Sequence, residues 1–352
     1  MNVIELENIE PRVIRNRYRH NFSRHLLGVT RHLQTTMMNA LQQQYGHENL
    51  RLGFSAYITL VGAGEKRLTD LAEILGISRQ ACNQAAKQVE AAGYIERTDD
   101  PADGRAKRLT LSSRGIKLRQ DGLCLVAQLD RQFAETIGSE RIVDASKSLR
   151  KISDRLALGL TPHDNNANAK TVMGGLLPRL SDYTLQRLME LTREKGHPGL
   201  KLCFGQVLGL IGPSGGRIQQ IAAVHDVTKQ AISAIGTELE RLGYLHRRAD
   251  PRDARQVVLM FTVRGEKLIA DSIMSGDELE NEFADIIGQA ALKRLDATLH
   301  DLYFGLGLEQ EIIETGSAAD MSLLAHQLQQ RLGEQGSKAL ASLLLCPTEH
   351  AR

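Results

Sequence analysis

Tryptophan is absent from this sequence of 352 residues, and aromatic residues make up only 4% of it. So few aromatic rings argue against an aromatic-lined carbohydrate site and against a base-stacking platform for single-stranded nucleic acid. No apolar run approaches the roughly 18 residues of a membrane-spanning helix, and the acidic start MNVIELENIE lacks the apolar stretch of a signal peptide. We therefore expect a cytoplasmic protein.

The sequence is also poor in the residue patterns of enzymes and metal centres. Its four cysteines lie far apart and form no CxxC pair, which predicts neither a disulfide framework nor a zinc site. A P-loop, a nucleophile elbow, an HExxH motif and a dinucleotide fingerprint are all missing. We therefore expect no enzymatic activity, no cofactor and no metal. The net charge of +2 hides an asymmetry, because residues 1–160 carry about six excess basic side chains and the remainder about four excess acidic ones.

What the sequence does contain is a repeat with an offset of 150 residues. The pair Gly93-Tyr94 recurs as Gly243-Tyr244, and the alignment runs on from there without a gap. The residues that recur identically include Arg67, Ala72, Gln80, Ala81, Glu90, Arg97, Asp100, Pro101, Asp103, Arg105, Leu109, Arg114, Gly115, Lys117 and Leu118. This period is far longer than the roughly 20 to 50 residues of a solenoid unit, so it predicts a duplicated domain. We place a first unit at 1–160, a polar linker at 161–172, a second unit at 173–310 and a helical C-terminal tail, packed on the core, at 311–352.

Each unit predicts a helix, a tight turn and a second helix. A long basic helix is expected over 13–45, and RLTDLAEILG then has apolar residues at the spacing of an amphipathic helix. Ser78 and Thr228 are expected to cap the N-termini of the second helices. Gly93 and Gly243 are expected to end those helices, because glycine adopts the left-handed conformation without steric cost.

A two-stranded hairpin, or wing, is expected to follow each helix-turn-helix. In the first unit it comprises a strand at 94–98, a turn at 99–106 (DDPADGRA) and a returning strand at 107–112. Ser112 and Thr262 then stand where the N-cap of a long closing helix is wanted. Together with residues 139–158, that helix is expected to supply a helical interface.

This arrangement predicts contacts with duplex DNA. The second helix of a helix-turn-helix can enter the major groove, where Gln and Asn pair with adenine and Arg and Lys bind guanine or phosphate. A basic wing tip can reach the minor groove, where narrow A·T tracts attract an inserted arginine such as Arg105, held in orientation by Asp103. The candidate DNA-binding residues are Ser78, Arg79, Gln80, Asn83, Gln84, Lys87, Asp103, Arg105, Lys107, Thr228, Lys229, Gln230, Ser233, Arg252, Asp253 and Arg255. Those expected to pack inward are Ala81, Cys82, Ala85, Ala86 and Val89.

The stretch RLTDLAEILGISRQACNQAAKQVEAAGYIERTDDPADGRAKRLTLSSRG resembles the winged-helix core of the MarR (multiple antibiotic resistance regulator) family. The resemblance rests on the Gly-aromatic step, the Asp-Pro-x-Asp-x-Arg wing and the Leu-x-Leu-Ser/Thr-x-x-Gly exit. The stretch RIQQIAAVHDVTKQAISAIGTELERLGYLHRRADPRDARQVVLMFTVRG resembles the same family, so that together they cover most of residues 13–308. The resemblance implies a transcription regulator, more commonly a repressor, that binds double-stranded DNA and responds to a small aromatic effector.

Members of that family typically carry one domain per chain and act as homodimers, whereas this chain contains both halves. The expected fold is therefore mainly α with small β wings (α+β), as tandem winged helix-turn-helix domains forming an intramolecular pseudo-dimer. The halves have diverged: Ala234 and Thr237 replace Gln84 and Lys87, and Val257 and Val258 replace Lys107 and Arg108. We expect an asymmetric pseudo-palindromic operator, with the first half contributing more of the salt-dependent affinity.

Other interpretations of single residues are weaker. His20, His25 and His32 fall within the first predicted helix, but His20 and His25 are five apart and are not expected to share a face, as metal ligands must. Cys82 lies near a helix N-terminus, as redox-sensing thiols do, but its counterpart Ile232 indicates a buried position. Residues that qualify by composition to line an effector pocket are Arg15, Tyr18, Arg19 and Phe22. The main alternative function is an interaction protein or anti-regulator that keeps the fold without binding DNA.

Overall fold

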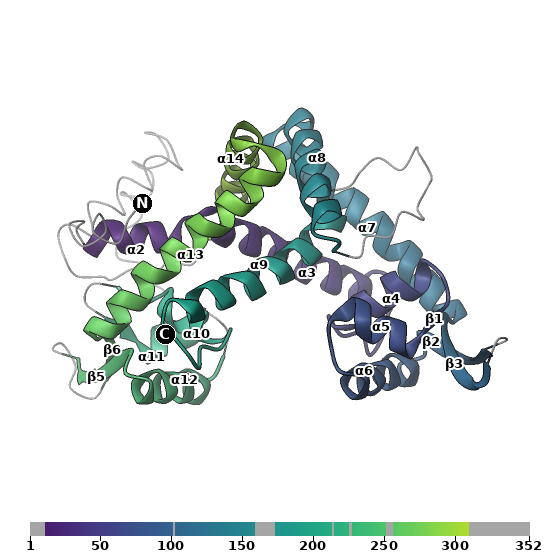
Figure 1. Cartoon of the computed structure of the whole chain (residues 1–352), viewed down its shortest axis with the longest axis horizontal. Coiled ribbons are helices and arrows are strands. Elements are labelled where there is room, and N and C mark those ends of the chain that lie inside the picture. Colours follow the sequence, from purple (N-terminus) through teal and green to yellow (C-terminus); the bar gives the residue numbers. More distant parts are fainter. Residues whose placement is uncertain are drawn as a thin grey trace, which may run out of the picture.

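The computed structural model describes residues 11–100, 103–158, 173–212, 215–224, 227–250 and 256–309. The described part is mainly helical, with two small antiparallel sheets. Figure 1 shows an arch in which the long helices meet at the top and a compact group of short helices with its own sheet forms each foot. Within these residues, no helix is long and apolar enough to cross a membrane.

The described residues of the first half form ten elements, among which the expected helix-turn-helix, wing and closing helices follow one another in the expected order. Three helices come first, and a short strand then precedes the helix-turn-helix, so that the wing becomes a three-stranded sheet in the order β1-β3-β2. The elements are α2 (Pro11–Arg19), α3 (Phe22–Gln43), α4 (Phe54–Gly62), β1 (Lys66–Arg67), α5 (Leu68–Leu75), α6 (Arg79–Ala91), β2 (Ile95–Asp100), β3 (Asp103–Leu111), α7 (Ser113–Ile137) and α8 (Ser139–Arg155).

The second half places like elements at positions about 150 residues later. Its sheet has the equivalent order β4-β6-β5. The elements are α9 (Met173–Glu194), α10 (Phe204–Leu208), β4 (Gly216–Arg217), α11 (Ile218–Val224), α12 (Lys229–Arg241), β5 (Leu245–Ala249), β6 (Val257–Phe261), α13 (Val263–Ile287) and α14 (Gln289–Gly305). The register also corresponds, since Arg97 pairs with Leu109 and Arg247 with Leu259.

The expected helix caps are present in both halves. The Ser78 hydroxyl accepts from the Ala81 amide, and the Thr228 hydroxyl accepts from the Ala231 amide. Ser112 and Thr262 cap α7 and α13 in the same way. After α6 and α12 the chain turns through Gly93 and Gly243, each with φ +79°. These caps fix where each second helix begins and ends.

Three local expectations were wrong. The helix expected over 13–45 is divided into α2 and α3, because the Asn21 side chain accepts from Arg24 N and donates to the carbonyls of Arg17 and Tyr18. The turn expected at 99–106 is much shorter, since β2 extends to Asp100 and β3 starts at Asp103. Ala81 is exposed, whereas Cys82, Ala86 and Val89 are buried as expected.

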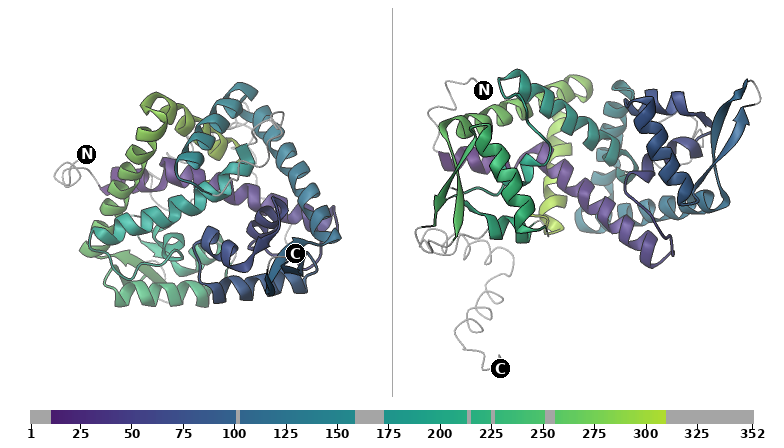
Figure 2. Two further views of the ribbon diagram at one scale, coloured as in Figure 1. Left: turned by 45° about the vertical axis from the view of Figure 1, so that its right-hand side comes forward. Right: turned by 90° about the horizontal axis from the view of Figure 1, so that it is seen from below.

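The two halves share one apolar core and each winged helix has its own. The shared core contains buried residues of α3, α7 and α8 together with residues of α9, α13 and α14, among them Phe22, Leu149, Leu180 and Phe283. Separate clusters surround Tyr94 in the first winged helix and Tyr244 in the second. The helix α2 belongs to the first half by sequence but packs on α13 of the second half. The helical layer thus joins the two feet of the arch (Figure 2).

Candidate nucleic-acid interface

The helices α6 and α12 lie along the lower edge of the arch, and the two wings lie at its outer ends (Figure 1). Each of these helices is the second of a helix-turn-helix, the element that enters a major groove in DNA-binding proteins of this class. Apolar side chains on the opposite face, such as Cys82 and Ile232, hold each helix against its own core. The outward faces are therefore free to meet a partner.

Most of the candidate residues on α6 lie on its outward face. Arg79, Gln80, Gln84 and Lys87 are exposed. Asn83 is half-buried, and its Oδ1 accepts from Arg97 Nη2 at 3.1 Å, so its acceptor is already engaged within the protein. The Ser78 hydroxyl is used by the N-cap. Among the described residues, α6 thus presents two charged and two amide side chains that make no hydrogen bond or ion pair with another side chain.

The outward face of α12 presents fewer unengaged hydrogen-bonding side chains than that of α6. Lys229 and Gln230 are exposed at its start, but Lys229 Nζ donates to Gln219 Oε1 at 3.1 Å. Ser233 is half-buried and accepts from Arg247, as does Thr237. The exposed Ala234 replaces Gln84 of the first half. This helix accordingly presents fewer unengaged polar side chains than α6.

An arginine braces the wing against the second helix in both halves. Arg97 Nε donates to Glu90 Oε2 at 2.8 Å, and Arg247 Nε lies 3.5 Å from Glu240 Oε2. Both arginine–glutamate pairs recur at the 150-residue offset, so the sequence contained the signal, although no role was assigned to them. The brace links the position of each wing to that of its helix.

The basic strand of the first wing is largely neutralised by the wing's own acids. Lys107 Nζ donates to Asp99, and Arg108 contacts the fully buried carboxylate of Asp100 at 3.0 Å. Arg67 also donates to that carboxylate, at 2.5 Å. A paired cation has a weak net field, so these contacts argue against the expected contribution of Lys107 and its neighbour to salt-dependent affinity.

The second wing carries basic residues that sequence reasoning overlooked. His246 and Arg248 of β5 are exposed, at the positions held by Glu96 and Thr98 in the first half. Within the described residues, Arg248 pairs with no acidic side chain. Of the candidate wing-tip residues, the side chains of Asp103 and Arg105 lie outside the described part of the structure, as do Arg252, Asp253 and Arg255 altogether. Their role at the tip stays a prediction.

A His–Asp pair in each half was also missed, partly buried in the first half and buried in the second. His47 Nε2 lies 2.8 Å from Asp121 Oδ2, and His197 Nε2 lies 2.7 Å from Asp271 Oδ2. His197 Nδ1 also contacts the Tyr244 hydroxyl at 3.2 Å. Each pair ties the loop before a winged helix to the long helix behind it. The exact recurrence of His and Asp after 150 residues is the sequence signal that could have found them.

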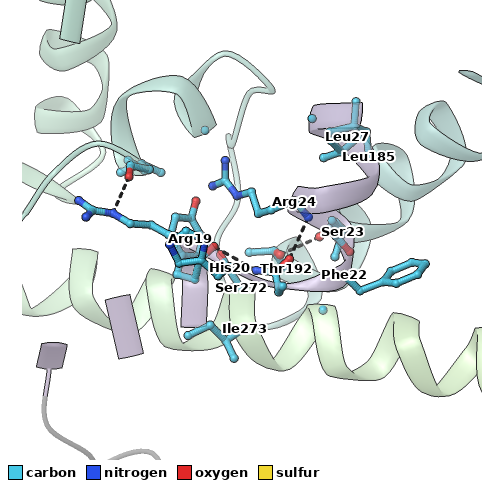
Figure 3. Close-up of a pocket in the computed structure, with 18 of the residues that line it drawn as sticks. Arg19, His20, Phe22, Ser23, Arg24, Leu27, Leu185, Thr192, Ser272 and Ile273 are labelled. Atoms are coloured by element: carbon cyan, nitrogen blue, oxygen red, sulfur yellow. Dashed lines mark hydrogen bonds between the residues drawn. The ribbon is translucent and has the colours of Figure 1, made fainter. Parts of the chain in front are cut away.

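A cavity of about 770 Å³ lies between the α2–α3 junction, the second winged helix and the helices α9, α13 and α14. Of the residues expected to line a pocket, Tyr18, Arg19 and Phe22 do so. Arg15 instead pairs with Glu266 at 3.2 Å. Figure 3 shows Arg19, His20 and Arg24 at the α2–α3 junction near Ser272 and Ile273 of α13. The cavity combines apolar walls with a few charged groups, as small-molecule sites do.

A carboxyl group in this cavity titrates near neutrality. Burial, together with the carboxylates of Asp296 and Asp277, raises the pKa of Glu280 to about 7, against the opposing effect of Arg17. Because this pKa is higher in the folded than in the unfolded chain, the free energy of unfolding decreases as pH rises. Between pH 5 and 7 the decrease is expected to be about 2 kcal/mol. Urea unfolding at both pH values should show a smaller decrease in Glu280→Gln, and an identical pH dependence would contradict this assignment.

The weaker single-residue interpretations gain little support. His20 and His25 were not expected to meet, but the helix break brings their rings to 6.5 Å, and His300 lies 5.2 Å from His25. In the part of the chain that the structure describes, no three His, Cys, Asp or Glu residues are grouped as metal ligands. Cys82 is fully buried with its thiol facing the Leu68 carbonyl, which argues against a redox-sensing thiol.

The geometry defines a winged helix-turn-helix protein, and comparison with known proteins agrees for the first half. Residues 58–106 match the sequence model of the MarR family, which places a MarR family domain there. The chain is 32% identical over 68 residues to the transcriptional regulator HosA of Escherichia coli O111:H-. That alignment covers 19% of this chain and 50% of the relative, so the chain spans about half the length of the curated relative it matches.

Two solved structures are also similar to the chain. A MarR family transcriptional regulator from Rhodococcus sp. RHA1 is 23% identical, with a TM-score of 0.31, and the match covers 38% of this chain and 93% of that one. The transcriptional regulator Tm0710 from Thermotoga maritima is 22% identical, with a TM-score of 0.28, covering 37% and 91%.

Proposed function

We propose that the chain is a sequence-specific double-stranded DNA-binding transcription regulator built as an intramolecular pseudo-dimer. The observation that carries the proposal is the placement of two exposed second helices, α6 and α12, on one edge of a single chain (Figure 1). Homodimeric regulators place such helices roughly one helical turn apart, about 34 Å, to meet a palindrome. Here residues 1–160 and 173–310 would take the places of the two subunits, joined by a linker at 161–172.

The two halves would bind unequal half-sites. The guanidinium and amides of Arg79, Gln80 and Gln84 suit direct reading of guanine and adenine. On α12, Ala234 offers no hydrogen bond and Thr237 is engaged by Arg247, so this half would depend more on phosphate contacts from Lys229 and Arg248. We therefore assign sequence reading mainly to the first half and place more of the electrostatic binding in the second wing than the sequence alone indicated.

Repression is the mode we propose, by occupation of an operator near a promoter. A small aromatic effector bound in the cavity would regulate it, because the cavity walls come from both halves and the cavity's shape depends on how the halves are placed. Such an effector shifts the arrangement only to the extent that it binds one spacing of the recognition helices more tightly than another.

A reciprocal exchange in the wings tests this division. Arg248→Thr should make the negative slope of log affinity against log salt less steep by about 1, because one phosphate contact is lost. Thr98→Arg should make the slope steeper by about 1. Fluorescence anisotropy titrations of duplex DNA at several salt concentrations measure both slopes. Lys151→Ala, an exposed cation of α8 outside both winged helices, serves as the control and should change nothing. Equal slopes in all variants would contradict the assignment, and absence of salt-dependent binding would favour an interaction protein.

A further inference from the structure

The long helices α7 and α13 differ in how one equivalent face is covered. Leu123 of α7 is 55% exposed, whereas its counterpart Ile273 of α13 is 5% exposed. Ile116, which lies seven residues or about two helical turns earlier on the same face of α7, is 48% exposed. The same apolar position is therefore buried in one half and open to solvent in the other.

The helix α2 crosses this face in the second half. Arg15 contacts Glu266 at 3.2 Å and Arg17 contacts Asp277 at 2.5 Å, while Ile14 and Tyr18 pack against the apolar cluster that contains Ile273. The positions equivalent to Glu266 and Asp277 on α7 are Ile116 and Ala127, seven and four residues from Leu123. The exposed strip of α7 therefore corresponds to the face of α13 that α2 covers in the second half.

The linker is unsuited to cover this strip as α2 covers α13. At the 150-residue offset, Asp164 and Asn168 stand in place of Ile14 and Tyr18, so its sequence supplies no apolar side chain at either contact position. A different segment has to provide the apolar contact if the strip is covered.

We propose that residues 321–332 of the C-terminal tail bind as an amphipathic helix to the strip formed by Ile116, Leu123 and Ala127 on α7. These residues have apolar side chains at the required helical spacing, namely Met321, Leu324, Leu328 and Leu332. The charges of the connecting segment also fit. Residues 310–320 contain three acidic residues and no basic one, and the exposed cations Lys117 and Arg131 flank the strip. The segment 321–332 itself carries only the charge of Arg331. In the second half the signs are reversed, with a basic α2 on an acidic α13.

The tail is long enough to reach this surface. Gly305, at the end of α14, adjoins Thr136 near the end of α7, because a Cβ at Gly305 would lie 3.0 Å from Thr136 Cγ2. From Thr136 to Leu123 along the helix is about 20 Å, and to Ile116 about 30 Å. The eleven residues 310–320 span up to about 36 Å when extended. The bound tail would support the first winged helix as α2 supports the second, independently of whether the protein binds DNA.

Alkylation of a thiol placed on the strip tests the proposal in the full-length chain. Gln120→Cys introduces a thiol at an exposed site on this face, and native Cys203, exposed in the second half, provides an internal reference. The maleimide reaction at each site is followed by peptide mass spectrometry. Adding Leu328→Asp should accelerate the reaction at position 120 by about tenfold, because loss of one buried leucine contact weakens docking by about that factor. The rate at Cys203 should not change.

Gln327→Asp adds the same charge on the polar face of the segment and is the matched control, expected to leave the rate at position 120 unchanged. Equal rates in the Leu328→Asp and parent chains would overturn the proposal, as would equal acceleration by Gln327→Asp. Protection that increases with protein concentration would also overturn it, because the strip would then be covered by a second copy of the chain.

Discussion

Gly115→Ala is expected to unfold the first winged helix at much lower urea concentration, with a loss of about 3 kcal/mol in the free energy of unfolding. A Cβ at Gly115 would lie 1.9 Å from the Tyr94 carbonyl oxygen, a backbone atom that cannot move aside. The Ser112 amide donates to that same carbonyl, so a shift would also disturb the start of α7. Hydrogen exchange by residue measures the loss separately in each winged helix.

The equivalent change in the second half should have the same effect. A Cβ at Gly265 would lie 2.0 Å from the Tyr244 carbonyl oxygen. The matched controls are Gly122→Ala in α7 and Gly276→Ala in α13, where nothing lies within 4 Å of the added Cβ. These controls should be neutral or more stable by up to about 1 kcal/mol, since alanine favours helix over glycine. Similar stability in Gly115→Ala and Gly122→Ala would contradict the close helix–strand contact.

Arg79→Ala should weaken binding to the operator by about 10-fold to 100-fold, and binding to unrelated duplex DNA much less. The guanidinium of Arg79 is exposed at the start of α6, where early residues of such helices meet base edges. Lys229→Ala, at the equivalent position of α12, should cost less, because an ammonium group lacks the rigid planar fork of donors that a guanidinium offers to guanine, and Lys229 Nζ already donates to Gln219. Anisotropy titrations at one salt concentration compare the two variants.

Lys151→Ala again controls for the loss of a positive charge alone. An equal loss of affinity for specific and unrelated DNA in Arg79→Ala would indicate a phosphate contact in place of base reading. A greater effect of Lys229→Ala than of Arg79→Ala would contradict the unequal roles assigned to α6 and α12.

Local structure was largely predictable from the sequence because it depends on near neighbours. The caps at Ser78 and Thr228 and the turns at Gly93 and Gly243 follow from chemistry within a few residues. The division of the helix expected over 13–45 at Asn21 was missed, although it too depends on near neighbours. The apolar residues keep their helical spacing on both sides of Asn21, so the pattern does not show where one helix ends and the next begins. The length of the wing strands was underestimated. Asp100 was assigned to the turn, whereas it belongs to β2 and is bound by Arg67 and Arg108 from the other two strands of the sheet.

The sequence predicted where the candidate side chains lie, but not which of them are already engaged by other side chains of the protein. Helical spacing placed Asn83 on the outward face of its helix, and Lys107 was a candidate as a basic residue of the wing. Their engagement by Arg97 and Asp99 depends on strand register. The basic residues His246 and Arg248 of β5 were not predicted, because the repeat does not mark them: Glu96 and Thr98 stand at the equivalent positions of the first half. The cavity was beyond prediction in its details, since it requires α2 of one half to pack on α13 of the other, a contact between residues about 260 positions apart.

Selection of binding sites from random duplexes by the purified full-length protein at low salt, followed by a salt titration of the selected site, tests the central claim most directly. The proposed pseudo-dimer predicts an enriched site with two unequal half-sites roughly one helical turn apart, bound by one chain with steep salt dependence. No enrichment and no salt-dependent binding would contradict direct DNA recognition and direct the search to protein partners.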